Sequence, residues 1–269
     1  MAKIVAGLGL GILGTIDGLS IYKMRGVEHP VIRRKGGPSK EKIRTDPKLH
    51  QVRNNISEFA GRAKAAKYIM RALQDQKPLA DHNIAGRLNA MMMPIQVLDG
   101  ENDWAKRSVR LSAYPQLLNG FSLNRNNPFD STIRFPLDFY LSRETGAATV
   151  QIPDLLPGIS FFAPDIYPWF RVIVSLGLVP DVVFAEEGKK YMPVDFLYEK
   201  IPVVTAKTSW YPVAEGSIGT VLDLAIPSLP GKSDYTLVLS AGISYGKQQT
   251  NELIIQARHA GCAKVLVAC

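Results

Sequence analysis

The chain has 269 residues, of which 46% are hydrophobic, and it carries 32 Lys and Arg against 24 Asp and Glu. That length and apolar content suffice for one large core or two smaller ones, and they exclude a wholly disordered chain. The excess charge is N-terminal, because residues 1–100 carry +9 and residues 101–269 carry −1. A basic segment of this kind binds nucleic acid, an anionic membrane surface or an acidic patch on a neighbouring subunit.

The first segment contains a glycine pattern that is typical of nucleotide-binding enzymes. Gly9, Gly11 and Gly14 have the spacing G-x-G-x-x-G, and an apolar run precedes them. A dinucleotide fingerprint also needs a helix after its third glycine, but β-branched residues and another glycine follow Gly14. We therefore predict no nucleotide cofactor. No metal site is predicted either, because the four histidines are isolated in the sequence.

A β-meander is the better interpretation of this segment. Asp17-Gly18 lies between two short apolar runs, and this dipeptide is a strong signal for a two-residue hairpin turn. We predict paired strands at Ile12 to Ile16 and Leu19 to Met24, and a third strand at Val31 to Arg34. A short meander has little core of its own and offers free strand edges to a neighbouring subunit.

The same apolar run resembles a signal peptide, since Lys3 precedes it. Glycines interrupt the run, Asp17 closes it, and no small-x-small cleavage site stands out. No stretch of 18 apolar residues occurs, so no membrane-spanning helix is expected. The sequence indicates no particular compartment and is compatible with a cell-surface or particle-associated protein.

The segment RRKGGPSKEKIR, residues 33–44, is predicted to be a basic loop or arm. Its candidate interaction residues are Arg33, Arg34, Lys35, Lys40, Lys42 and Arg44. One interpretation is an arm that contacts phosphates. The other is a solvated connector, which the absence of interleaved aromatic residues for base stacking favours.

Two helices are predicted next. Asp46 followed by Pro47 is typical of a helix start, with the carboxylate as N-cap. Apolar residues then recur at spacings of four and three, which predicts an amphipathic helix to about Gln76. The expected buried stripe is Val52, Ile56, Phe59, Ala63, Ala66, Met70 and Leu73. A second helix from about Asp81 is expected to bury Ile84, Leu88, Met91 and Ile95, with a kink or an end at Pro94. The two helices form an antiparallel hairpin in this interpretation.

From about residue 107 the hydrophobic period changes to two, which predicts strands. The expected strands are 108–113, 133–140, 148–152, 169–178, 203–210, 219–226 and 235–243. Many short strands separated by Pro, Gly and Asp turns favour an antiparallel, immunoglobulin-like β-sandwich. The predicted fold class is therefore α+β, with a helical and basic region over 1–125 and a sandwich over 126–269.

Residues 242–246, GISYG, match the nucleophile elbow G-x-S-x-G with Ser244 in the nucleophile position. Residues 247–260 can be read as a helix after that elbow or as a further strand, and both alternatives stay open. Glu252 and His259 follow too closely to fold back above Ser244, so no serine hydrolase is predicted.

Two further groups of residues are candidates for ligand binding or for a disulfide. The aromatic residues Tyr167, Trp169, Phe170, Trp210 and Tyr211 could furnish a carbohydrate-binding patch, although core packing is the commoner role of aromatic residues in a sandwich. Cys262 and Cys269 would lie about 23 Å apart along one strand, so no disulfide between them is predicted.

The order of parts resembles a group of uncharacterised bacterial hypothetical proteins. The resemblance is carried by GILGTIDGLSIYKM, RRKGGPSKEKIRTDP and QVRNNISEFAGRAKAAK, and it is most specific over residues 12–75. It implies a fold and no activity. The sequence as a whole predicts a non-enzymatic structural protein that assembles with copies of itself. The alternatives are a module that binds nucleic acid or another anion and, less favoured, a nucleotide-dependent or serine enzyme.

Overall fold

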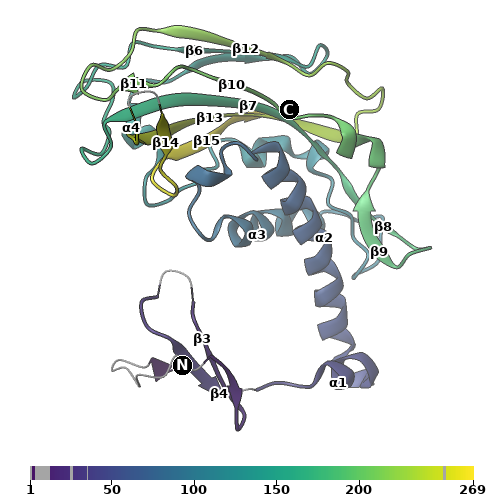
Figure 1. The fold of residues 1–269 in the computed structure, drawn as a ribbon. Helices are drawn as coiled ribbons and strands as arrows, with labels where there is room; N and C mark the ends of the chain where they lie inside the picture. Colours follow the sequence, from purple (N-terminus) through teal and green to yellow (C-terminus); the bar gives the residue numbers. More distant parts are fainter. Residues whose placement is uncertain (1, 4–12, 25–26, 35, 251–252) are drawn as a thin grey trace. The chain divides into compact units, whose positions relative to one another are not determined.

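The computed structural model describes residues 2–3, 13–24, 27–34, 36–250 and 253–269. The chain divides into two compact units, residues 1–54 and 55–269, and each is described by itself. The whole is a mixed helix-and-sheet fold whose C-terminal part holds a curled antiparallel sheet (Figure 1). Within the described ranges, no helix combines the length and the apolar character that a membrane crossing needs.

The first unit is a small antiparallel sheet followed by a short helix. The strand order is β1 (Ala2–Lys3), β4 (Val31–Arg34), β3 (Leu19–Tyr22) and β2 (Gly14–Ile16). Asp17 and Gly18 have φ angles of 46° and 74°, as a type I′ turn requires, so the predicted hairpin is confirmed. The predicted third strand is confirmed as β4. Ile12, Gly9 and Gly11 lie outside the described residues.

Side-chain caps fix the chain between this sheet and the long helix. The Ser39 hydroxyl accepts a hydrogen bond from Lys42 N at 3.1 Å and begins α1 (Lys40–Thr45). The Asp46 carboxylate accepts one from Lys48 N at 2.9 Å and begins the 3₁₀ turn η1 (Pro47–Leu49). The predicted helix start at Asp46 is therefore confirmed, and α2 (His50–Ala72) follows without a break.

The predicted stripe is confirmed as buried only in its C-terminal part, at Ala66 and Leu73, and is wrong in its N-terminal part. Val52, Ile56 and Phe59 are exposed, and no residue of α2 before Glu58 is buried. The buried residues of α2 are Glu58, Gly61, Ala65, Ala66, Tyr68, Ile69 and Ala72. The physical reason is close packing: a Cβ on Gly61 would lie 2.6 Å from the Tyr191 ring, so the helix presents its smallest residues to its neighbours.

Helix α3 (Ile84–Val97) follows the 3₁₀ turn η2 (Lys77–Leu79), and Arg62 of α2 donates a hydrogen bond to the Gln96 side chain of α3 at 3.2 Å. Ile84, Leu88 and Ile95 are buried as expected, but Met92 takes the fully buried place expected for Met91. Pro94 lies inside the helix and does not end it.

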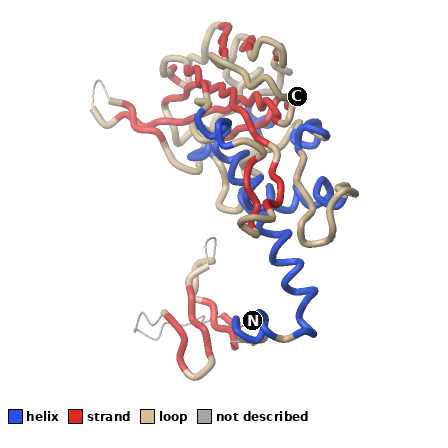
Figure 2. Tube along the Cα trace, turned by 90° about the vertical axis from the view of Figure 1, so that its right-hand side faces the viewer, coloured by secondary structure: helices blue, strands red, loops and turns tan. Residues whose placement is uncertain are grey.

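The second unit has three layers, which Figures 1 and 2 show from two sides. The large sheet contains β10 (Val204–Lys207), β7 (Trp169–Pro180), β13 (Tyr235–Gln248) and β14 (Ile254–Gln256), with β11 (Tyr211–Pro212) beside β7 and β15 (Cys262–Ala268) beside β13. The smaller sheet has the order β12 (Thr220–Ala225), β6 (Ala147–Ile152), β5 (Asp138–Leu141). A hairpin of β8 (Val182–Ala185) and β9 (Lys190–Pro193) is separate. The short elements are η3 (Leu111–Ala113), η4 (Pro115–Leu118), α4 (Phe129–Thr132) and η5 (Phe196–Lys200).

Two cores lie on the two faces of the large sheet. The predicted alternation on β7 and β13 is confirmed, since Phe170, Val172, Leu237 and Leu239 all pack in the core shared with the smaller sheet. The opposite face packs against α2 and α3 through residues such as Val238. The predicted boundary at residue 125 thus falls inside the second unit, where helices and sheet share one core.

Two strand predictions need correction, and one open alternative is decided. The predicted strand 108–113 is absent: Val109 forms only an isolated bridge with Val182, and Leu111–Ala113 is the 3₁₀ turn η3, in which Ser112 N donates to the buried carboxylate of Asp181 at 2.9 Å. Only the end of the predicted strand 133–140 is a strand, β5. Of the two alternatives for 247–260, the strand is correct, since β13 continues to Gln248 and pairs with β14.

Candidate interaction surfaces and clefts

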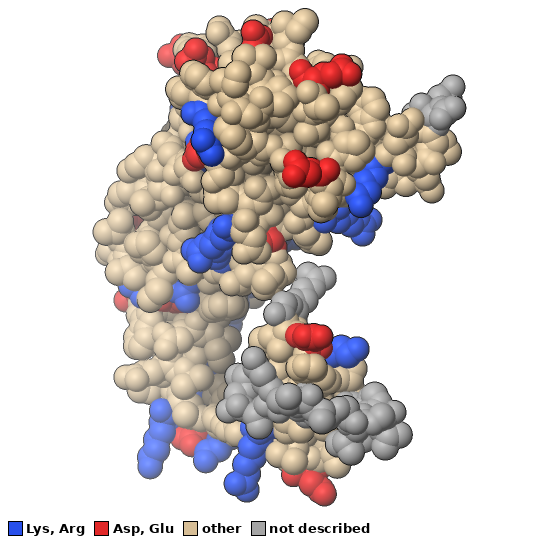
Figure 3. All heavy atoms as spheres, turned by 90° about the vertical axis from the view of Figure 1, so that its left-hand side faces the viewer, with Lys and Arg blue, Asp and Glu red and all other residues tan. Residues whose placement is uncertain are grey.

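The predicted basic arm is divided between a strand and a helix. Arg33 and Arg34 are exposed on β4, and the Arg33 guanidinium lies 5.6 Å from the centre of the Tyr22 ring. Lys40, Lys42 and Arg44 are exposed on α1, so Ser39 and its cap make this part helical where a loop was expected. Lys35 lies outside the described residues. In the lower part of Figure 3, which draws this unit, Lys and Arg side chains project from the surface.

The charge of the first unit is largely unbalanced within the chain. Residues 1–54 carry 11 Lys and Arg against four Asp and Glu, a net charge of +7. The ion pairs among described residues all join side chains of residues 58–264, and none includes a side chain of the first unit. These cations are therefore available to an anionic partner.

An apolar stripe on α2, formed by Val52, Ile56 and Phe59, is exposed. The exposed fractions of these three side chains are 37%, 54% and 56%. Their spacing of four and three residues places them on one face of the helix. The three residues are the N-terminal part of the predicted apolar pattern, whose later members Ala66 and Leu73 are buried.

Hydrogen bonds of Glu58 and Ser57 attach another side of α2 to the rest of the second unit. Glu58 is 3% exposed, and its carboxylate accepts hydrogen bonds from Arg107 at 2.5 and 2.8 Å and from Ala105 N at 3.2 Å. The Ser57 hydroxyl donates to Ala105 O at 2.6 Å, and the Tyr191 hydroxyl donates to the same oxygen. Burial, aided by the charge of Glu58, raises the pKa of Tyr191 to about 12. Sequence analysis missed Glu58, because a lone acid in a helix carries no hydropathy signal.

The small sheet of the first unit also exposes its apolar side chains. Leu13, Ile16 and Leu19 are between 43% and 54% exposed. Val31 is the one apolar side chain that is buried among the described residues of this unit. A sheet of two- to four-residue strands with so little core is marginal on its own.

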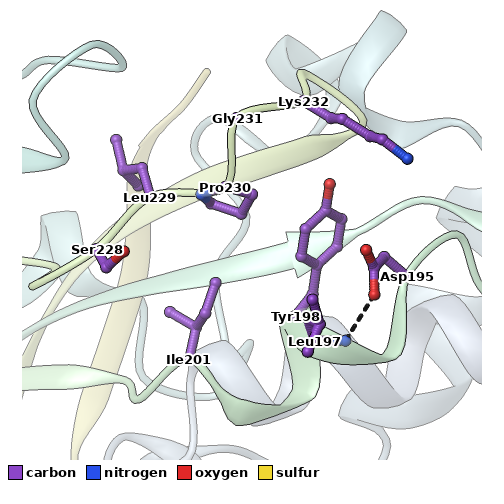
Figure 4. Close-up of a pocket in the computed structure, with 9 residues that line it drawn as sticks. All are labelled: Asp195, Leu197, Tyr198, Ile201, Ser228, Leu229, Pro230, Gly231 and Lys232. Atoms are coloured by element: carbon purple, nitrogen blue, oxygen red, sulfur yellow. Dashed lines mark hydrogen bonds between the residues drawn. The ribbon is translucent and has the colours of Figure 1, made fainter.

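Figure 4 shows a pocket of about 370 Å³ between η5 and the loop before β13. Ile201, Leu229 and Pro230 form its apolar side, and the Tyr198 ring stands between them and Asp195. The Tyr198 hydroxyl donates to Asp234, and burial with that hydrogen bond raises the pKa of Tyr198 far above its usual value. The Asp195 carboxylate accepts from Leu197 N at 2.8 Å and caps η5, so its hydrogen-bonding capacity is partly used.

Two clefts lie at one end of the two sheets, where the predicted aromatic patch is partly assembled. Tyr167 and Trp169 line a cleft of about 720 Å³, and Tyr211 lines a second of about 510 Å³. Phe170 is fully buried in the core, and the Trp210 indole lies over the Arg171 guanidinium at 4.4 Å, outside both linings. Phe162, which sequence analysis did not single out, joins the first cleft.

The residues weighed for catalysis are separated or covered. Ser244 lies in the middle of β13, fully buried and paired across the strands with Arg171, so no nucleophile elbow forms there. His259 Nδ1 lies 2.8 Å from the carbonyl oxygen of Ala80, and Glu252 lies outside the described residues. Among the residues that the structure describes, no group of three His, Cys, Asp or Glu side chains could hold a metal ion.

Comparison with known proteins gave no match: no family model, no curated protein and no solved structure is similar to this chain.

Proposed function

We propose that the protein is a non-enzymatic structural protein that assembles with copies of itself. The observation that carries this proposal is the exposed stripe of Val52, Ile56 and Phe59 on α2. Covering a half-exposed Ile or Phe side chain contributes about 1 kcal/mol or more, so three on one face favour association. The spacing of four and three is also the repeat with which helices pair in coiled coils.

Two other features support self-assembly. The sheet of the first unit exposes Ile16 and Leu19, and among the described strands β1 and β2 lie at its edges, to which another strand can add. The first unit carries +7, whereas residues 55–269 carry most of the acidic side chains, so a head-to-tail contact is favoured electrostatically. Such a contact closes into a ring or continues as a filament.

The proposal includes an immunoglobulin-like architecture for the two packed sheets. Antiparallel strands of both sheets contribute to one core, as in that architecture. The sandwich would then be the rigid body that the assembly repeats, while residues 1–60 supply the contacts.

The test is the mass of the full-length chain in solution, measured by light scattering on a sizing column. We expect a species larger than one chain that persists at high salt. The double variant Ile56→Glu/Phe59→Glu should raise the dissociation constant of the assembly by roughly 100-fold, because each change places a charge in the contact. Circular dichroism of the same variant checks that the fold is retained.

Ile255→Glu is the matched control, since Ile255 is 48% exposed on β14. It introduces the same charge at a similarly exposed isoleucine and should leave the mass unchanged. A wild-type chain that stays monomeric at every concentration contradicts the proposal. An assembly that survives the double variant would move the contact away from α2.

A second candidate function is the binding of nucleic acid by the basic arm. It is favoured by the net charge of +7 on residues 1–54 and by the absence of ion pairs to them among the described residues. Binding to a duplex DNA of 30 base pairs should weaken steeply with salt. The triple change Arg33, Arg34 and Lys35→Gln should abolish it; unchanged binding would exclude the arm.

A further inference from the structure

We infer that the two clefts at the end of the sheets form a binding site for a neutral oligosaccharide. The register places Trp169, Pro212 and Gly246 side by side at the end of the large sheet, and Ile152 and Thr220 at the corresponding end of the smaller one. The loops 153–168 and 213–219, which connect the sheets there, form the walls.

The larger cleft offers aromatic rings together with hydrogen-bonding groups. Phe162, Tyr167 and Trp169 line it and are partly exposed, and Asp165 and Gln248 supply a carboxylate and an amide. Its volume of about 720 Å³ is within the range of small-molecule sites. Aromatic rings provide flat apolar surfaces, which suit the apolar faces of pyranose rings, and the polar groups can accept hydrogen bonds from hydroxyls.

The second cleft extends the first, because both are lined by Pro212. Asp154, Glu215 and Ser217 bring further acceptors to it, beside Tyr211. Acceptors that are spread along two adjoining clefts fit a ligand that presents hydroxyl groups repeatedly along its length. This is the property that distinguishes a chain of sugars from a compact ligand.

The lining also selects the charge of the ligand. No Lys, Arg or His is among the residues that line the two clefts, all of which are described, whereas Asp154, Asp165 and Glu215 are acidic. These carboxylates disfavour a phosphate or a carboxylate, although two cations lie beside rings of the first cleft, Arg134 at Phe162 and Lys247 at Tyr167. A neutral, hydroxyl-rich ligand meets no such penalty.

The walls are held in place before any ligand arrives. Leu155 and Ser217 exchange backbone hydrogen bonds at 2.9 and 3.1 Å, and the Asp154 carboxylate accepts from Gly219 N at 2.6 Å. Gly216 has a φ of 73°, and a Cβ there would lie 1.9 Å from Leu155 O, so this approach of the loops requires glycine.

Two of the rings are fixed as well. The Tyr167 ring stacks on Tyr245 with centres 5.5 Å apart, and the Arg134 guanidinium lies 3.7 Å from the centre of the Phe162 ring. Groups that are already ordered lose little conformational entropy on binding, which favours a built site over an accidental hollow.

The experiment is native gel electrophoresis of the full chain in gels that contain laminarin, xyloglucan or galactomannan, with a polymer-free gel as reference. We expect retardation in at least one of the three gels. Trp169→Ala and Tyr167→Ala should each weaken the binding at least tenfold, measured from retardation against polymer concentration.

Trp210→Ala is the matched control, because it removes the same side chain outside both linings. It should be retarded like the wild type, and unchanged thermal unfolding confirms that the variants are folded. Absence of retardation in all three neutral gels overturns the inference, as does equal retardation of wild type and Trp169→Ala. Tryptophan fluorescence gives a second readout. If tetramethylammonium changes it while the three neutral polysaccharides leave it unchanged, the clefts bind an organic cation and the inference also fails.

Discussion

The two units of this chain solve the problem of stability in opposite ways. Residues 55–269 build two cores on the two faces of one sheet, with side chains such as Phe170 and Leu239 fully buried. Among the described residues of 1–54, Val31 alone is a buried apolar side chain, and the strands are two to four residues long. The second unit therefore has two extensive cores, whereas the described part of the first unit has almost none.

The difference indicates where to look for function in this chain. Apolar side chains that are buried in the cores of the sheet layers stabilise the fold and need no further explanation. Regular apolar patterns that the chain leaves exposed, such as Ile56 and Phe59, need another explanation. The proposed self-assembly supplies it, and the contrast between the units can be tested by substitutions in each.

The largest expected effect is in the second unit. Phe170 is fully buried, and its ring centre lies 4.3 Å from that of Phe161. Phe170→Ala should lower the free energy of unfolding by about 4 kcal/mol, measured by urea denaturation, because it leaves a cavity. Ile16→Ala, at a 52% exposed position of the first unit, should change the same quantity by less than about 0.5 kcal/mol. Similar losses from both would remove the contrast.

An intermediate effect is expected at Asp81, which joins the start of α3 to the segment around Arg125. Burial alone would raise the pKa of Asp81, but hydrogen bonds from Arg125 N and Asn83 N, together with Arg87, hold it below its usual value. Asp81→Asn should cost about 2 kcal/mol at neutral pH.

The pH dependence of this variant sharpens the prediction. A folded-state pKa below the unfolded value of about 3.9 means that Asp81 stabilises the fold above that pH. The contribution is lost as the pH falls through the folded-state value. The difference between wild type and Asp81→Asn, measured by denaturation at pH 6, 4 and 3, should therefore shrink on acidification. A difference that stays constant from pH 6 to pH 3 would contradict this account.

The smallest effect is expected at the hairpin turn of the first unit. Gly18 has a φ of 74° with open space around it, so the cost of Gly18→Ala is conformational, about 1 kcal/mol. Hydrogen exchange should accelerate at the amides of β2 and β3 and stay unchanged in the second unit. Gly100→Ala serves as control, because no atom lies within 4 Å of the added Cβ and its φ is ordinary. Acceleration throughout the chain would mean that the units are not energetically separate.

Local chemistry accounts for the parts of the fold that could be predicted. Asp17-Gly18 requires two positive φ angles, Asp46 caps a helix start, and the alternation from Phe170 to Leu176 needs one apolar face. Each of these signals is complete within a few residues. The buried face of α2 was predicted correctly at Ala66 and Leu73 but not at Val52, Ile56 and Phe59, because hydropathy reveals that an apolar face exists but not which part of it becomes buried. Gly61 and Glu58, which actually face inward, give no hydropathy signal.

The clefts show the same limit. Tyr167 and Trp169 were recognisable as candidates because they are adjacent in the sequence. Their assembly with Pro212 depends on the pairing of Leu155 with Ser217, which are far apart in the chain. Phe162 was missed, since a single aromatic residue in a proline-rich loop does not indicate whether it faces a core or a cleft.

The strand β13 has a consequence for the tolerance of the chain to mutation. Twelve successive residues, from Tyr235 to Gly246, are buried, because one face meets the smaller sheet and the other meets the helices. An ordinary surface strand accepts polar changes at every second position. In a library of all single substitutions, β13 should instead appear as an unbroken block of intolerant positions, in which even its small polar residues resist enlargement. Amino-acid substitutions should therefore accumulate in the loops and on the outer surfaces of this protein, and rarely in its longest strand.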